Sequence, residues 1–219
     1  MIELPLFPLH SVLFPGTPLS LHIFEERYKL MVNECIQNRQ PFGVVLIEQG
    51  RAEGDPNVQP VMVGCTAQIT QVQPLRDGRM TITTVGRERF RILSLKHDRP
   101  YLIGLVEMHP MAAISRDQLA SNGARLRVWV DRYLTILKRA GQVHYEQRQL
   151  PGDPLALAYL ASVLLQQISL NQKQELLESE DALEMLAELQ DIYRREVSLL
   201  DALLDPPEHD EQSGNFSMN

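Results

Sequence analysis

The spacing of apolar residues changes once along this chain, and the change limits the folds that it can adopt. Up to about residue 110, apolar and polar residues alternate, as in "VMVGCTAQITQV" at 61–72. Alternation of this kind is typical of strands with one buried face. After residue 114, apolar residues recur every three to four positions, which is typical of amphipathic helices. The chain is therefore predicted to be α+β, with a β-rich part first and helices after it.

The first part is predicted to form closely spaced antiparallel strands in a curled sheet or small barrel. Asp77-Gly78 is the dipeptide expected at a tight hairpin turn. Residues 101–108, "YLIGLVEM", are apolar on both faces and suit a central strand. One helix is expected at 25–39, lying on the sheet, and a polar surface loop at 48–60.

The start of the chain is rich in prolines. Pro5 and Pro8 are compatible with an edge strand, where no ladder donor is needed. Pro15-Gly16 is expected to turn the chain, and "LSLHIF" at 19–24 is expected to form a second strand that leads into the helix. This stretch is interpreted as a structural device of the sheet.

The second part contains clear helix starts. Ser115 with Gln118 three positions later has the spacing of a capping box. Asp153 followed by Pro154 predicts an N-cap and a first helical position. A further helix is expected from Ser179 onward. We predict a β-rich subdomain at 1–113, a helical bundle at 114–204 and a disordered acidic tail at 205–219.

Composition and charge exclude several classes of function. The 219-residue chain has a formal net charge of −7, which does not favour nucleic acid or an anionic membrane. No stretch has the apolar length of a membrane span, and the N-terminus does not resemble a secretory signal. Cys35 and Cys65 are expected to be reduced thiols. A cytoplasmic location is therefore predicted.

Motifs of catalysis are missing from the sequence. No glycine is followed by lysine and no two glycines stand two apart, which excludes the common phosphate-binding loops. The histidines form no H-E-x-x-H pair, and there is no G-x-S-x-G or S-x-x-K motif. We expect a chain that is not an enzyme and that has no cofactor and no metal. A site assembled only by folding stays open as an alternative.

Several segments resemble one known family. "LPLFPL", "VLFPG" and "LHIFEERYKLMV" resemble the start of the Lon substrate-binding domain, the N-terminal domain of ATP-dependent Lon proteases. The resemblance continues through "FGVVLI", "VGCTAQI", "DGRMTITTVGRERFRI", "PYLIGLVE" and "KQELLESEDALEMLAEL", over roughly residues 3–204. Glu26 and Cys65 depart from the proline and threonine expected there. The resemblance implies a PUA-like β-rich pseudo-barrel followed by a helical bundle. Because no ATPase or protease module is present in the sequence, a stand-alone member is expected.

The resemblance implies a polypeptide-binding function. We expect an adaptor that captures unfolded or specific protein clients in protein quality control, with a protease or chaperone as a further partner. The candidate site is the strand–helix junction with its motif-matched residues His22, Phe24, Glu25, Arg27 and Tyr28. The alternative is that all five residues only fix the junction. His22, for example, is more simply a hydrogen-bonded structural residue than a base or ligand.

Two other functions stay open. The first is RNA binding by the β-rich part, with phosphate contacts from Arg76, Arg79, Arg87, Arg89 and Arg91. Against it, arginines that alternate with Phe90 and Ile92 are also typical of the solvated face of a sheet. The second is a small-molecule sensor that uses a cavity between the two parts of the chain.

Overall fold

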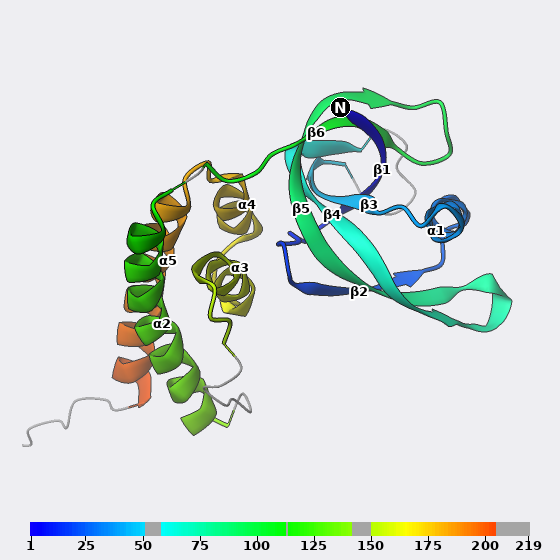
Figure 1. Cartoon of the computed structure of the whole chain (residues 1–219). Coiled ribbons are helices and arrows are strands. Elements are labelled where there is room, and N and C mark those ends of the chain that lie inside the picture. Colours follow the sequence, from blue (N-terminus) through cyan, green and yellow to red (C-terminus); the bar gives the residue numbers. More distant parts are fainter. Residues whose placement is uncertain (51–57, 113, 142–149, 205–219) are drawn as a thin grey trace, which may run out of the picture.

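The computed structural model describes residues 1–50, 58–112, 114–141 and 150–204, and these contain six strands and five α-helices (Figure 1). The predicted tail at 205–219 and most of the loop predicted at 48–60 lie outside the described residues. The elements are β1 (Ile2–Leu9), β2 (Pro18–Ile23), α1 (Glu26–Asn38), β3 (Phe42–Gln49), β4 (Gln59–Pro74), β5 (Met80–Lys96), β6 (Ile103–Met108), α2 (Arg116–Arg139), α3 (Pro154–Leu164), α4 (Leu170–Glu178) and α5 (Ala182–Leu204).

The six strands form one sheet that closes on itself. Their order is β2-β5-β4-β3-β1-β6, with an additional pairing of β5 with β6. Closure is possible because β5 is 17 residues long: its first half pairs with β2 and its second half with β6, while β4 pairs along its other side. The expected curled sheet is therefore observed, and β2 is left at its end.

The expectation of a purely antiparallel sheet is wrong at one pair of strands. β1 and β3 are parallel, so the sheet is mixed. Parallel neighbours need a long crossover connection, and the 32 residues between Leu9 and Phe42 include β2 and α1. The sequence did not predict the crossover, because its local patterns indicate a strand and a helix at β2 and α1 but not the relative direction of the strands on either side.

The expected edge position of β1 is also wrong, because β1 lies between β3 and β6. It pairs with β6 as far as Pro5 and with β3 from Leu6 onward. The N–H of Leu6 donates to the carbonyl of Leu102 at 2.8 Å and so faces β6. Since successive strand amides face opposite sides, the nitrogens of Pro5 and Pro8 each face the side on which β1 has no partner. The prolines therefore cost no ladder bond.

The helix α1 covers one opening of the sheet. Tyr28, Met31, Val32 and Cys35 are buried on its inner face, as their spacing predicts, whereas Ile36 is 39% exposed. The hairpin predicted at Asp77-Gly78 is present between β4 and β5 as a short 3-10 turn at Arg76–Gly78. The turn is longer than two residues but joins the predicted strands.

The helical half is built around α3. Figure 1 shows α3 and α4 between the closed sheet and the α2–α5 pair. Asp153 caps α3 as predicted, since its side chain accepts the N–H of Ala156. Ser115 precedes α2 but makes no side-chain cap hydrogen bond. The helix expected from Ser179 begins later, at Ala182.

Side chains of the β-rich half contribute to the core of the helical half. Phe14 and Val63 are buried in the same cluster as Leu126, Leu157 and Tyr193. The rings of Phe14 and Tyr159 lie 6.1 Å apart, centroid to centroid. The two halves therefore share a packed interface. The subdomain boundary at residue 114 stays a prediction.

Candidate functional site

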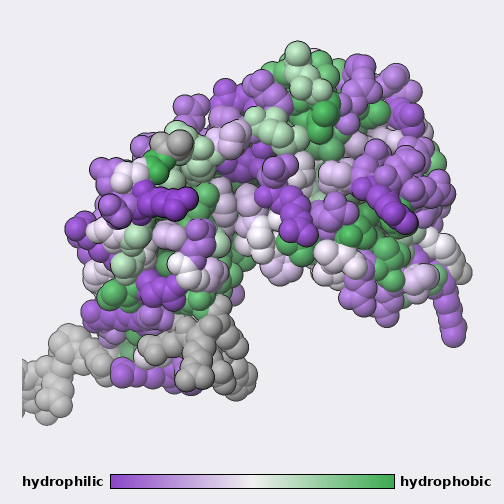
Figure 2. Space-filling model, in the orientation of Figure 1, coloured by the Kyte–Doolittle hydropathy of each residue, from purple (hydrophilic) through white to green (hydrophobic). Residues whose placement is uncertain are grey.

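The strand–helix junction follows β2 directly, and two of its candidate residues are exposed. His22 is the last but one residue of β2, and Phe24, with 46% of its surface exposed, lies between β2 and α1. Their rings stack with centroids 6.0 Å apart. Figure 2 shows apolar surface among polar residues on this part of the molecule, over the positions of α1 and β2. The pair is accessible to a partner.

The other three candidates hold the junction together. Arg27 Nε donates to Glu25 Oε2 at 2.9 Å, and the Arg27 guanidinium lies 4.6 Å from the centre of the Tyr28 ring. The Tyr28 ring stacks on Phe7 with centroids 4.0 Å apart and is 4% exposed. Burial raises the pKa of Tyr28 to about 12. Tyr28 thus belongs to the core beneath the junction, and Glu25 and Arg27 cover it.

The strand β2 has an open edge beside this pair. Among the described residues it pairs with β5 only, from Pro18 to Ile23. Ser20 and His22 point outward, whereas Leu19 and Leu21 are half-buried against the core. An open edge presents unpaired backbone N–H and C=O groups, which can pair with an extended segment of another chain.

The five arginines of the RNA-binding alternative do not form one surface. Arg89 is 3% exposed, and its Nη1 donates to the carbonyls of Leu177 and Ser179, both at 2.6 Å. It is thus committed to the C-terminal end of α4. Arg79 lies in the hairpin, ten residues before Arg89. Ten residues of extended strand span about 33 Å, so the two side chains are far apart. RNA binding stays a prediction without a continuous basic patch.

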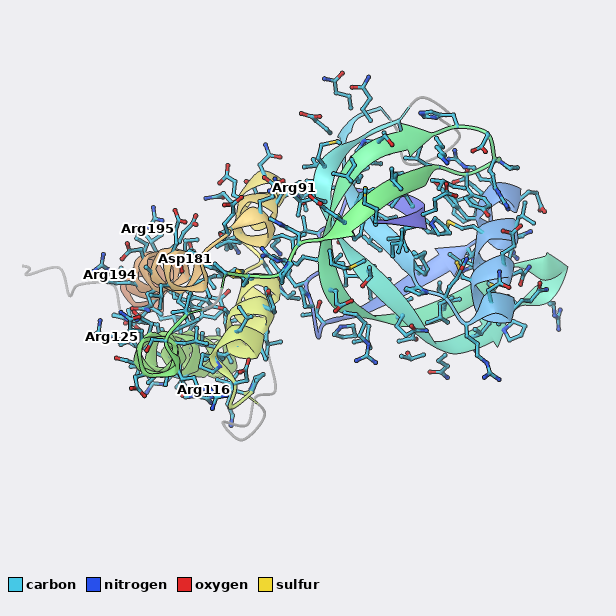
Figure 3. All side chains as sticks on the ribbon, turned by 45° about the horizontal axis from the view of Figure 1, so that its top comes forward. Arg91, Arg116, Arg125, Asp181, Arg194 and Arg195 are labelled. Carbon is cyan, nitrogen blue, oxygen red and sulfur yellow. The ribbon has the colours of Figure 1, made fainter. Side chains whose placement is uncertain are left out.

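Arg91 is held at the boundary between sheet and helices. Its Nη2 lies 3.3 Å from Glu180 Oε1 and 3.3 Å from His109 Nε2. Figure 3 shows Arg91 where β5 meets the helical half, whereas the other labelled arginines lie on α2 and α5: Arg116, Arg125, Arg194 and Arg195.

A pocket of about 330 Å³ lies between the two halves. It is the type of cavity that the small-molecule alternative requires. Its polar lining is Arg87, Glu88, Arg89 and His109, and its apolar lining is Pro15, Met108, Pro110, Met111, Leu155 and Tyr159. Sequence reasoning missed His109, Leu155 and Tyr159. His109 follows β6, whereas Leu155 and Tyr159 lie on α3, and no local motif links them.

Burial and charge both act on the titratable groups of this pocket. The pKa of His109 is lowered, first by burial and then by Arg89 and Arg91. Burial also lowers the pKa of Arg89 and raises that of Tyr159. Within the described parts of the chain, no group of three His, Cys, Asp or Glu side chains is placed to hold a metal ion. The described helices also include none with the length and apolar character of a membrane span.

Residues 3–195 match the model of the ATP-dependent protease La (LON) substrate-binding domain. The chain belongs to this family. A Lon protease of Cytophaga hutchinsonii is 27% identical over 206 residues, which cover 90% of this chain and 25% of that protein. A LON peptidase N-terminal domain and RING finger protein of Schizosaccharomyces pombe is 28% identical over 117 residues, covering 48% of this chain and 24% of the relative.

Two solved structures share the fold. The Lon N-terminal domain protein from Xanthomonas campestris aligns with a TM-score of 0.64 and 25% identity, over 87% of this chain and 98% of that one. The N-terminal domain of the Mycobacterium avium complex Lon protease aligns with a TM-score of 0.67 and 20% identity, over 88% and 98%. The family prediction made from the sequence is confirmed, and its relation to PUA-like barrels stays a prediction. The chain spans a quarter or less of the length of the curated relatives named here.

Proposed function

We propose that this chain binds segments of other proteins without catalysing a reaction, and that it acts as an adaptor in protein quality control. Membership in the LON substrate-binding domain family supports recognition of protein substrates. The observation that carries the proposal is the open edge of β2, which ends beside the exposed His22 and Phe24 rings. The proposed location is cytoplasmic, and the proposed partners are unfolded or specific clients and a protease or chaperone.

The mode of binding follows from the chemistry of a strand edge. An extended client segment would exchange backbone hydrogen bonds with β2, which requires no particular client sequence. Apolar client side chains would then cover Phe24, which has 46% of its surface exposed. Most backbone groups of a folded protein are already paired within its own structure, so it offers few segments for such a contact. The edge therefore favours unfolded segments over folded proteins.

The proposal is tested with a fluorescently labelled globular protein that has been reduced and carboxymethylated, so that it stays unfolded. The full chain should bind this probe and not its folded form, as measured by fluorescence anisotropy. Phe24→Ala should weaken binding about fivefold, because roughly half of a phenylalanine surface is lost from the contact. Val128→Ala is the matched control, since Val128 is 65% exposed on α2.

Hydrogen exchange locates the contact. Amides of β2 should become protected when the unfolded probe is bound, and amides on the outer face of the helical half should not. Protection confined to the helices, with unchanged affinity of Phe24→Ala, would show that β2 is not the binding edge. Binding to RNA that weakens steeply with salt, in place of binding to the unfolded probe, would favour the alternative function.

A further inference from the structure

The pocket between sheet and helices contains an incompletely bonded buried arginine. Arg89 is 3% exposed and lines this pocket. Its Nη1 is satisfied by the carbonyls of Leu177 and Ser179, but its Nη2 has no hydrogen-bond partner among the described residues. A buried donor of this kind is rare in folded proteins. The atom is closed off from solvent, so a ligand oxygen reaches it only when the adjacent pocket wall moves aside.

No described carboxylate neutralises the Arg89 charge in an ion pair. Its partners are backbone carbonyls at the C-terminal end of α4, and the electrostatic effect of Glu180 on it is weaker than that of burial. A guanidinium is desolvated at less cost than an ammonium and binds a planar carboxylate well. Arg89 therefore offers a fixed positive charge and a directed N–H group.

The groups around Arg89 favour a single negative charge. Arg87 and His109 line the pocket with it, and Arg91 lies against His109. The acidic groups near them are Glu88, Glu107 and Glu180, which are exposed. A ligand with several charges would be repelled by these carboxylates. A ligand with one negative charge is attracted by Arg89 and is repelled least by these carboxylates.

The rest of the pocket is apolar. Met111 and Leu155 are half-buried, and the ring of Tyr159 is 6% exposed. With a volume of about 330 Å³, the pocket is at the small end of ligand sites. It accommodates a short apolar group next to the charged one.

We propose that this pocket binds an organic carboxylate that carries a short apolar substituent, with Arg89 Nη2 donating to the carboxylate. Two sources share this chemistry: the C-terminus of a polypeptide that ends in an apolar residue, and a free aliphatic acid. The site is separate from the β2 edge and does not rest on the function proposed there.

Calorimetric titration of the full chain with four probes tests the site. N-acetyl-leucine represents a chain terminus, 4-methylpentanoate a free acid, N-acetyl-leucinamide the same group without charge, and inorganic phosphate a charge without an apolar part. The two carboxylates should bind, and the amide and phosphate should not. Tighter binding of N-acetyl-leucine than of 4-methylpentanoate assigns the site to chain termini, and equal binding assigns it to carboxylates in general. Equal binding of phosphate, or no binding of either carboxylate, would overturn the proposal.

Variants separate binding from folding. Arg89→Lys keeps the charge but removes the Nη2 donor. It should weaken the binding of both carboxylate probes about tenfold or more. Because Arg89 also joins the two halves, Leu155→Glu provides a second variant that leaves it intact and places a competing carboxylate at the pocket wall. Val163→Glu, on the same helix and 38% exposed, is the control and should bind like the wild type. Unchanged binding in Leu155→Glu would contradict the proposed location.

The His109 ring gives a readout that a purely structural role of Arg89 would not produce. A carboxylate bound beside it should raise its pKa, which Arg89 and Arg91 now lower together with burial. NMR titration of the ring protons in the presence and absence of N-acetyl-leucine measures this shift. A raised pKa of His109, with no change at the exposed His22, supports the site. An unchanged His109 pKa at saturating probe would overturn it.

Discussion

At the scale of single residues, the two cysteines show how burial determines thiol chemistry. Cys35, on α1, is 1% exposed, and Cys65, on β4, is fully buried. Burial raises the pKa of Cys35 to about 11 and that of Cys65 to about 12. Since the thiolate is the nucleophile, neither residue is a reactive thiol in the folded chain. On the inner face of α1, Cys35 therefore acts as a small apolar residue of the core.

The raised thiol pKa values predict a loss of stability in alkali. In the unfolded chain the thiols ionise near their ordinary pKa of 9.0, whereas in the folded chain both stay protonated to about pH 11. Their contribution is thus fully present below pH 9.0 and is lost as the pH rises toward 11. Each thiol should lower the free energy of unfolding by about 1.4 kcal/mol per pH unit in this range.

Urea unfolding of the wild type and of the Cys35→Ala/Cys65→Ala double variant, at several alkaline pH values, measures this contribution. Tyrosine ionisation affects both proteins equally, so the difference in slope isolates the thiols. Parallel slopes for the two proteins would mean that the thiols are not the cause.

Arg89 shows where sequence reasoning fails at this scale. The alternation around Phe90 and Ile92 predicted correctly that these two side chains are buried. It also placed Arg89 on a solvated face with Arg87 and Arg91, but Arg89 is buried, Arg91 is half-buried and Arg87 is exposed. The outer face of β5 is covered there by α4, which comes about 80 residues later in the chain. No local pattern contains that contact.

At the scale of elements, the helix caps differ from the pattern in the sequence. Ser115 and Gln118 have the capping-box spacing, yet Ser115 makes no side-chain cap hydrogen bond. The box forms instead at α4, where the Gln172 amide donates its backbone N–H to Ser169 Oγ at 3.2 Å and Gln172 Oε1 accepts the Ser169 N–H at 3.0 Å. The spacing alone therefore did not decide which cap forms.

The two serines form a matched pair for mutation. Ser169→Ala should lower the free energy of unfolding by about 1 kcal/mol, because the backbone N–H of Gln172 loses its acceptor at the start of the helix. Ser115→Ala should change it by less than about 0.5 kcal/mol, since no hydrogen bond is lost. Urea unfolding measures both values, and equal losses would show that the Ser169 box does not stabilise α4.

The strands approach each other closely at glycines inside the closed sheet. A Cβ atom on Gly64 would lie 2.5 Å from the Val44 carbonyl oxygen and 2.7 Å from the Phe90 ring. Gly64→Ala should therefore lower the free energy of unfolding by about 2 kcal/mol or more, because the β3–β4 backbone must move. Gly152→Ala is the control, with no heavy atom within 4 Å of the new Cβ, and should be nearly neutral. Thermal unfolding compares the two variants. An unchanged stability of Gly64→Ala would show that the strands can move apart at this position without loss of stability.

At the scale of the whole molecule, the sequence predicted the order of the two halves but not their interface. The change of period near residue 114 indicated strands and then helices, and both are present. The parallel β1–β3 pair, the pocket and the buried Arg89 depend on contacts between distant segments. Of the five junction residues, helical spacing predicted the burial of Tyr28, but no sequence pattern showed that His22 and Phe24 are exposed while Glu25 and Arg27 cover the core. That distinction depends on how α1 packs against β1.

The shared interface predicts that both halves unfold together. Phe14 packs against Tyr159, Gln174 Nε2 donates to the Val63 carbonyl at 2.9 Å, and Arg89 binds the end of α4. Unfolding one half alone would expose the apolar surface of the interface on the other half and leave its buried polar groups unpaired. This cost favours unfolding of both halves in one transition. Trp129, the one tryptophan of the chain, reports on α2, while the two thiols report on the sheet and α1.

Fluorescence of Trp129 and exposure of the thiols should therefore have the same urea midpoint. Arg89→Met should lower the free energy of unfolding by about 3 kcal/mol and move both midpoints by the same amount, since the Leu177 and Ser179 carbonyls lose their donor. Arg87→Met, two residues earlier and exposed, is the control and should leave both midpoints unchanged. If the midpoints of the two probes separated in Arg89→Met but not in the wild type, Arg89 would be the contact that couples the halves. Two separate midpoints already in the wild type would mean that the interface is too weak to unite them, and the pocket would then lie between independently folding parts.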